Sequence, residues 1–147
     1  MTLYAESSAV LSWLLNERAA AQIRKSLAGA DMVVASDLTL IECDRVIIRA
    51  AALGELTEAE AADRRAHLSN AASRWHVLRI HPEIVQRARQ PFPFEPVRTL
   101  DAIHLASALV ARSAVAGLAV LSLDERVRRA ALGMGLSVQP AQLPPTA

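Results

Sequence analysis

Apolar and polar residues alternate along the chain in a pattern that predicts short strands separated by helices. Short apolar runs predict strands at 2–5, 32–35, 76–80, 118–121 and 136–138. Longer stretches, in which apolar residues recur every three or four positions, predict helices at 7–15, 18–27, 38–52, 58–73, 101–111 and 125–132. Strands that alternate with helices favour a parallel sheet with helices on both faces.

Local signals mark several ends of these elements. Thr57 and Glu60 form a predicted capping box at the start of one helix, and Asp37 is a candidate cap for the helix after it. Pro82 stands where a further helix can begin. The segment 91–96, with the sequence PFPFEP, predicts a rigid loop, because proline fits neither a helix interior nor a central strand.

Length and element order together predict one α/β domain over residues 1–139. A chain of 147 residues can bury a sizeable core without disulfides or structural metals. The last segment, 140–147, contains three prolines, and we expect it to be a flexible tail.

Composition narrows the cellular setting more than the activity. Hydrophobic residues make up 52% of the chain but aromatic residues only 3%, so small aliphatic side chains must build the core. The single cysteine, Cys43, cannot form an internal disulfide, and we expect it to be a buried apolar residue. Every apolar run is shorter than the ~20 residues that a membrane span needs, and the first strand leaves no room for a targeting segment. We therefore expect a cytoplasmic protein without a membrane anchor.

The basic residues do not decide the partner. The net charge is only +1, although fifteen of the sixteen basic residues are arginine. Arginine offers a planar fork of donors that suits phosphate. A GC-rich genome, which encodes arginine in place of lysine, explains the same bias.

Four acidic residues occupy positions that the pattern marks for chemistry. Glu6 and Asp124 directly follow predicted strands, Asp101 opens an apolar helix, and Glu42 lies inside another apolar helix. The carboxyl ends of parallel strands form the ligand-binding edge of an open α/β sheet. Carboxylates that converge there repel one another unless a cation offsets their charge, and oxygen ligands favour Mg²⁺ or Mn²⁺. The sequence therefore predicts a metal-dependent phosphoryl-transfer site.

Three of these acids also have an ordinary structural explanation. Glu6, Asp101 and Asp124 can each stabilise the start of a helix as a cap or a first-turn acid. Ser7 and Ser8, however, could cap the first helix without help from Glu6. A role in capping and a role in binding a cation are compatible for one carboxylate.

The remaining polar residues near these motifs admit similar alternatives. Glu42 could form an ion pair along its helix with Arg45 or Arg49, yet a carboxylate among apolar neighbours needs a partner. His104 is better explained as a hydrogen-bonded core or rim histidine than as a ligand, because an all-oxygen site suits Mg²⁺. Ser122 stands two residues before the last acid in an extended stretch, so both side chains can face one metal.

The order and spacing of these motifs resemble a PIN domain, specifically a bacterial VapC-like toxin of a type II toxin–antitoxin pair. The four motifs of the family are matched by LYAESSA at 3–9, SDLTLIE at 36–42, LDAIHLASA at 100–108 and LSLD at 121–124. The third match is the most specific, and the resemblance extends from residue 3 to about residue 138. It implies a three-layer α/β/α fold with a central parallel sheet of four to five short strands.

The resemblance also implies an activity, a cofactor and partners. The activity is endoribonucleolytic cleavage of RNA, usually tRNA or ribosomal RNA, by water attack that leaves a 3′-hydroxyl and a 5′-phosphate. One or two Mg²⁺ or Mn²⁺ ions would be held by Glu6, Glu42, Asp101 and Asp124, with Ser7 and Ser122 in supporting positions. A cognate VapB-like antitoxin would neutralise the toxin, and the toxin itself would form a homodimer.

One position departs from the family pattern. The first acid of the family is usually aspartate, whereas this chain has Glu6, whose side chain is one methylene longer. The longer side chain moves the carboxylate, so metal affinity or turnover could be lower. Two alternatives therefore stay open at this point: a PIN-like protein-interaction module with a weakened site, and a metal-dependent DNA nuclease or phosphatase.

Overall fold

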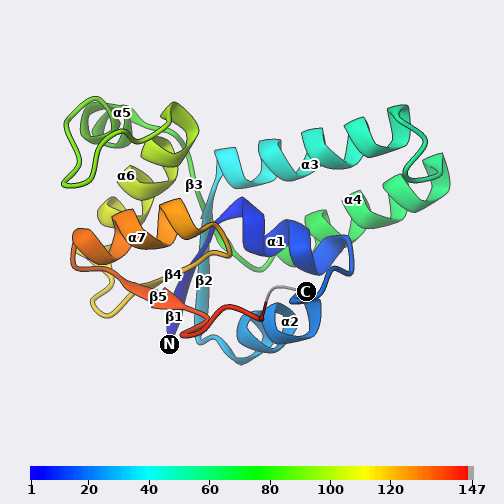
Figure 1. Cartoon of the computed structure of the whole chain (residues 1–147), viewed down its shortest axis with the longest axis horizontal. Coiled ribbons are helices and arrows are strands. Elements are labelled where there is room, and N and C mark those ends of the chain that lie inside the picture. Colours follow the sequence, from blue (N-terminus) through cyan, green and yellow to red (C-terminus); the bar gives the residue numbers. More distant parts are fainter. Residues whose placement is uncertain (146–147) are drawn as a thin grey trace.

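The computed structural model describes residues 1–145 and contains alternating strands and helices (Figure 1). The strands are β1 (Thr2–Ala5), β2 (Met32–Ser36), β3 (His76–Leu78), β4 (Ala119–Leu121) and β5 (Ser137–Gln139). The helices are α1 (Ser7–Leu14), α2 (Ala20–Gly29), α3 (Asp37–Ala52), α4 (Glu58–Ala72), α5 (Pro82–Ala88), α6 (Thr99–Ala114) and α7 (Glu125–Gly133). Each strand and helix predicted from the sequence is present, with ends shifted by a few residues.

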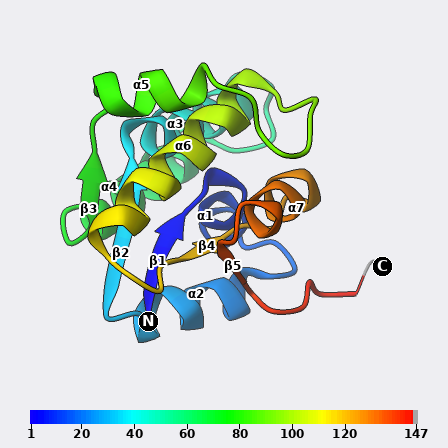
Figure 2. The same cartoon turned by 90° about the vertical axis from the view of Figure 1, so that its left-hand side faces the viewer.

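The five strands form one parallel sheet in the order β3-β2-β1-β4-β5. From β1 the chain adds β2 and β3 on one side, and later β4 and β5 on the other. The switch point therefore lies between β1 and β4, where Leu3 pairs with Ala119 and Ala5 with Leu121. Helices cover both faces (Figures 1 and 2), which confirms the predicted three-layer α/β/α fold. Open α/β sheets bind their ligands at the carboxyl ends of the strands beside such a switch point.

Alternate residues of the central strands face opposite layers of helices. Tyr4 and Val120 pack with α6 and α7 on one face of the sheet. Leu3, Ala5 and Leu121 face the other layer, where α1, α2, α3 and α4 complete two further clusters. Burial on both faces explains why these strands read as nearly continuous apolar runs in the sequence.

Two helix starts at which an acid was a candidate cap differ from the structure. The helix expected to open at Asp101 begins two residues earlier, at Thr99, so Asp101 lies within the first turn and is not the cap. Asp37 is the first residue of α3, and Ser36 is the N-cap because its backbone is still extended at the end of β2. In both cases the acid lies inside the helix, where its side chain is free for other contacts.

Other local signals behave as expected. The capping box at the start of α4 is present, with Thr57 N–H donating to Glu60 Oε1 and Glu60 N–H donating to Thr57 Oγ1, both at 3.1 Å. The proline loop at 91–96 has no helix or strand. Glu95 holds this loop, because its carboxylate accepts the N–H groups of Phe92 and Val97, both at 2.8 Å.

The predicted flexible tail is described only in part. Residues 140–145 have neither helix nor strand, while 146–147 lie outside the described residues, and the flexibility of the tail stays a prediction. Within residues 1–145, no helix combines the length and the apolar character that crossing a membrane requires.

Candidate active site

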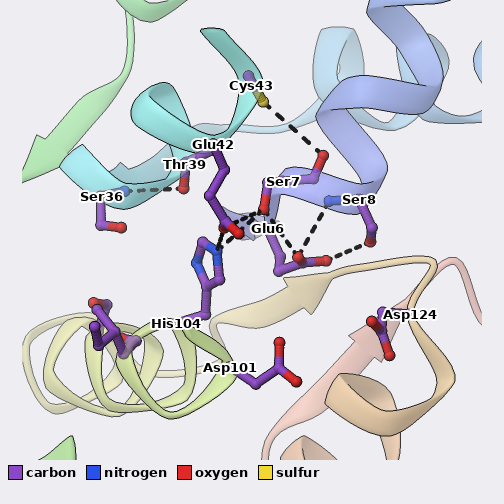
Figure 3. Close-up of polar contacts among 12 residues, drawn as sticks. Glu6, Ser7, Ser8, Ser36, Thr39, Glu42, Cys43, Asp101, His104 and Asp124 are labelled. Carbon is purple, nitrogen blue, oxygen red and sulfur yellow. Dashed lines mark hydrogen bonds and ion pairs between the residues drawn. The ribbon is translucent and has the colours of Figure 1, made fainter. Parts of the chain in front are cut away.

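The four predicted acids lie around the carboxyl ends of β1 and β4 (Figure 3). Glu6 follows β1 directly, and Asp124 is the N-cap of α7 after β4. Glu42 projects from α3 and Asp101 from the first turn of α6. Four segments that are distant in the sequence thus bring carboxylates to the switch point of the sheet.

Glu6 is fixed by hydrogen bonds from two sides. It is the N-cap of α1, and its carboxylate accepts the N–H of Ser8 at 3.1 Å. The same carboxylate accepts the hydroxyl groups of Ser8 and, at 2.7 Å, Ser122. Ser7 and Ser8 do not cap this helix in place of Glu6, because both already lie within it and Glu6 supplies the cap. Glu6 is only 5% exposed, so these contacts stabilise a nearly buried carboxylate.

Glu42 has a histidine and a serine as partners. His104 Nε2 lies 2.6 Å from Glu42 Oε1, and because a carboxylate only accepts, this nitrogen carries the proton. Ser7 Oγ lies 2.7 Å from the same oxygen and 3.1 Å from Glu6 Oε1, and its single proton can serve one carboxylate at a time. Among the described residues, no ion pair links Glu42 to an arginine of its own helix.

The second ring nitrogen of His104 also has a hydrogen-bond partner. The histidine is 1% exposed, and its Nδ1 lies 2.9 Å from the hydroxyl of Tyr4, which also bonds Ser36 Oγ at 3.1 Å. Burial raises the pKa of Tyr4 to about 12, so the phenol stays neutral and available for these bonds. Both nitrogens of His104 therefore have partners, which agrees with the predicted hydrogen-bonded core histidine.

Asp101 and Asp124 share a third residue, Arg98. Its Nε donates to Asp101 Oδ2 at 2.9 Å, and its Nη2 donates to Asp124 Oδ2 at 3.4 Å. Ser122 Oγ accepts the N–H of Asp124 at 3.1 Å and donates to Glu6, so the serine joins the last acid to Glu6. That the side chains of Ser122 and Asp124 face one metal stays a prediction. The Arg98 side chain is 59% exposed, so solvent screens its ion pairs and they add little to stability.

Burial and hydrogen bonds shift the pKa values of Glu42, Arg98 and Cys43. Burial raises the pKa of Glu42, but hydrogen bonds from His104 and Ser7 outweigh it, so this pKa lies below its usual value. The hydrogen bond to Asp101 and the charges of nearby acids raise the pKa of Arg98. Burial, followed by the two neighbouring glutamates, raises the pKa of Cys43, which is 0% exposed and fits the predicted buried thiol.

The donor set suits a divalent cation. Glu6 and Glu42 each offer a carboxylate oxygen, and these oxygens lie with a ring nitrogen of His104 within 4.8 Å of one another. Because both nitrogens of His104 are hydrogen-bonded, the histidine supports Glu42, and the carboxylates supply the ligand atoms. Asp101 and Asp124 stand outside this group and face it across the site (Figure 3). Carboxylate oxygens outnumber the hydroxyl protons near them, and an added positive charge would relieve their mutual repulsion.

Sequence reasoning gave little weight to two residues of this site, His104 and Arg98. The only sequence signal for His104 was its place one turn after Asp101 on an otherwise apolar helix. Arg98 stands three residues before Asp101, a spacing at which residues are neighbours once the helix begins at Thr99. Its contact with Asp124 depends on the approach of α6 to α7 and leaves no local signal.

A buried arginine supports the β4 side of the site. Arg128, on α7, is 9% exposed and donates to the carbonyl oxygens of Ser122 at 2.9 Å and Pro140 at 2.7 Å. Burial lowers the pKa of this guanidinium. Arg128 thus fixes the backbone of Ser122, whose hydroxyl donates to Glu6, and ties it to the segment that follows β5.

Arg128→Lys should destabilise the protein, because one ammonium group cannot reproduce two separate donors aimed at two carbonyls. We expect a loss of about 1.5 to 3 kcal/mol in the free energy of unfolding, measured by urea titration. Arg129→Lys, at the exposed neighbouring position, is the matched control and should change stability by less than about 0.5 kcal/mol. Equal midpoints for both variants would contradict this role.

Comparisons with known proteins agree with the motifs and the fold. The profile of the PIN domain family matches residues 3–132. Ribonuclease VapC45 of Mycobacterium tuberculosis is 29% identical over 143 residues, covering 97% of this chain and 98% of that protein. A toxin–antitoxin complex from Klebsiella pneumoniae superposes with a TM-score of 0.64 at 18% identity, over 98% of this chain and 100% of that chain. VapC20 of Mycobacterium tuberculosis, a sarcin–ricin loop cleaving toxin, gives a TM-score of 0.62 at 12% identity, over 87% of this chain and 94% of that chain. The two solved structures share the fold of this chain.

Proposed function

Because the chain belongs to the PIN domain family, we propose that it is a Mg²⁺- or Mn²⁺-dependent endoribonuclease that acts as the toxin of a toxin–antitoxin pair. The observation that carries this proposal is the arrangement of carboxylates at the switch point between β1 and β4. The name of the relative VapC45 and the description of VapC20 support RNA as the substrate.

The residues of the site have distinct proposed tasks. The metal would be held by Glu6, Glu42, Asp101 and Asp124. When bound, such an ion lowers the pKa of a water molecule and offsets charge on the scissile phosphate. Ser7 and Ser122 orient the carboxylates of Glu42 and Glu6 through hydrogen bonds. His104 holds Glu42 in place by donating its Nε2 proton.

The physical setting favours single-stranded or loop RNA over duplex. The four carboxylates are only partly accessible: Glu6 is 5% exposed, and the side chains of the other three acids are between 14% and 29% exposed. A scissile phosphate must enter this site, which a flexible single strand does more easily than a stiff helix. The resemblance to the toxin family implies tRNA or ribosomal RNA, and the accessibility of the site favours their loops as the proposed substrates.

Cleavage should require a divalent ion. We expect the purified protein to fragment tRNA or ribosomal RNA with Mg²⁺ or Mn²⁺ present and to lose this activity in EDTA, with recovery when the ion is restored. A single-stranded DNA of matched sequence serves as competitor, and cleavage of DNA at an equal rate would favour the nuclease alternative. RNA cleavage that continues unchanged in EDTA would reject the metal-dependent mechanism.

A protein partner should inhibit this activity. Arg98 demonstrates that a guanidinium fits between Asp101 and Asp124, and a basic side chain from a VapB-like antitoxin could pair with the same acids. We expect expression of the protein alone to arrest bacterial growth and co-expression with the small protein encoded beside it to restore growth. Equal toxicity with and without that partner would reject the proposal. Failure to cleave RNA together with stable partner binding would favour an interaction module.

Assembly and location are further proposals. We propose a homodimer in the cytoplasm, as the resemblance to the toxin family implies. A monomeric mass by light scattering at concentrations of tens of micromolar would count against the dimer.

A further inference from the structure

A cavity of about 450 Å³ adjoins the acid cluster and shares Asp101 with it. We call it the Phe94 pocket; it is lined by the loop 94–97, the start of α6 and one side of α7. Its volume falls within the range of pockets that hold small organic groups. Through Asp101 and Arg98 its wall continues into the candidate active site.

Phe94 gives this pocket an aromatic surface that is exposed but fixed. Its side chain is 53% exposed, whereas Tyr4 and Phe92 are buried. The ring packs against Gly133, where an added Cβ would lie 2.1 Å from Phe94 Cε2. Glu95, the next residue, is bonded to two backbone N–H groups of the loop. An apolar ring that packs against the protein on one side and stays exposed to solvent is suited to stacking on a flat ligand.

Arginines give the pocket a positive charge. Arg126 and Arg129 are exposed on α7 and line it together with Arg98. Within residues 1–145, neither Arg126 nor Arg129 belongs to an ion pair. The pocket's two carboxylates are already engaged, Glu95 by backbone N–H groups and Asp101 by Arg98. The two arginines on α7 are therefore available to an anionic ligand.

We propose that the Phe94 pocket binds a nucleotide of the RNA next to the scissile phosphate, with its base stacked on Phe94 and its phosphate held by Arg126 and Arg129. Base stacking on an aromatic ring beside basic side chains is the usual combination for single-stranded nucleic acid. Because every base has a flat face, this contact adds affinity without reading sequence. The inference rests on the proposed ribonuclease function and assigns it a substrate-binding subsite.

The stacking contact can be tested by direct binding in EDTA. We would measure fluorescence anisotropy of a labelled single-stranded RNA with the full chain. Phe94→Ala should weaken binding by at least about fivefold, and Phe94→Trp should retain it. Gly133→Ala should have a similar effect to Phe94→Ala, because its methyl group displaces the ring. Gly29→Ala, at the end of another helix with nothing within 4 Å, is the matched control and should bind like the parent.

The phosphate assignment can be tested by the salt dependence of the same binding. Replacing Arg126 and Arg129 with glutamine should reduce the slope of log affinity against log salt by about 0.7 for each phosphate that is no longer neutralised. Arg24→Gln, which removes an exposed arginine on α2, should leave the slope unchanged. An unchanged slope in the double variant would overturn the phosphate assignment.

The two proposals fail in different ways. If the parent cleaves RNA while Phe94→Ala and Gly133→Ala bind it as well as the parent does, the pocket assignment is overturned and the nuclease function stands. If the parent binds RNA through Phe94 but never cleaves it, the subsite stands and the nuclease function falls. A parent protein that neither binds nor cleaves single-stranded RNA would overturn both.

Discussion

Replacing Asp101 with asparagine should lower the rate of metal-dependent RNA cleavage by at least about 100-fold while the protein stays folded. Loss of a residue that only positions a metal ligand typically costs 10- to 100-fold, so loss of a ligand should cost at least about the upper figure. The amide keeps the shape of the side chain but removes the negative charge that a cation needs. Cleavage under single-turnover conditions and a thermal melt would be measured on the same samples.

The fold should tolerate this change because Asp101 is not the cap of α6. Its favourable interaction with the helix dipole is worth at most about 1 kcal/mol. Its pair with the exposed Arg98 is screened by solvent and adds little. Asp63→Asn is the matched control, since it breaks an exposed pair with Arg64 on α4, away from the site. Full activity of Asp101→Asn would remove Asp101 from the catalytic site.

Glu6→Gln should abolish cleavage, whereas Glu6→Asp should cleave at least as fast as the parent. The amide loses the charge, and its NH₂ group would face hydroxyls that now donate to a carboxylate. Aspartate is among the preferred N-cap residues, so the shorter acid can keep the hydrogen bond from Ser8 N–H. It would also return the carboxylate to the position usual in the family.

Glu60→Gln is the control that separates the loss of catalysis in Glu6→Gln from any loss of stability. Glu60 also stabilises the start of a helix, by accepting the N–H of Thr57 at 3.1 Å. Glu60→Gln should change stability only slightly, because the glutamine Oε1 can still accept the N–H of Thr57 in the capping box, and it should leave cleavage unaffected. Glu6→Gln should lower stability by a further amount, because Glu6 is nearly buried and has more hydrogen bonds. Unchanged cleavage in Glu6→Gln would leave a site of three carboxylates.

The length of Glu6 has a structural use that aspartate would not serve equally. Its carboxylate reaches both the first turn of α1 and the hydroxyl of Ser122 after β4. Ser122 in turn accepts the N–H of Asp124. The Glu6 carboxylate thus connects the segments that follow β1 and β4, the two strands at the switch point. The longer side chain would lower the affinity for metal, but it would make this connection between the two strands more rigid.

The sequence by itself determined the secondary structure and the fold class. The first four residues of β2, 32–35, are all apolar because parallel strands are buried on both faces, and the helices keep a periodic apolar stripe. Both signals are local, so they can be read without knowing the fold. Strand-to-helix order then placed Glu6 and Asp124 at the carboxyl edge of the sheet, because parallel topology allows no other arrangement.

Only the tertiary structure decided which groups meet. The bond of His104 to Glu42 joins residues 62 positions apart, and it depends on how α3 and α6 are rotated about their axes. The contact of Phe94 with Gly133 likewise depends on the approach of a loop to α7. Periodicity fixes which face of a helix is apolar, but it does not fix which neighbour that face or its edge will contact. Such contacts result from side-chain packing across the layers, which the linear pattern does not encode locally.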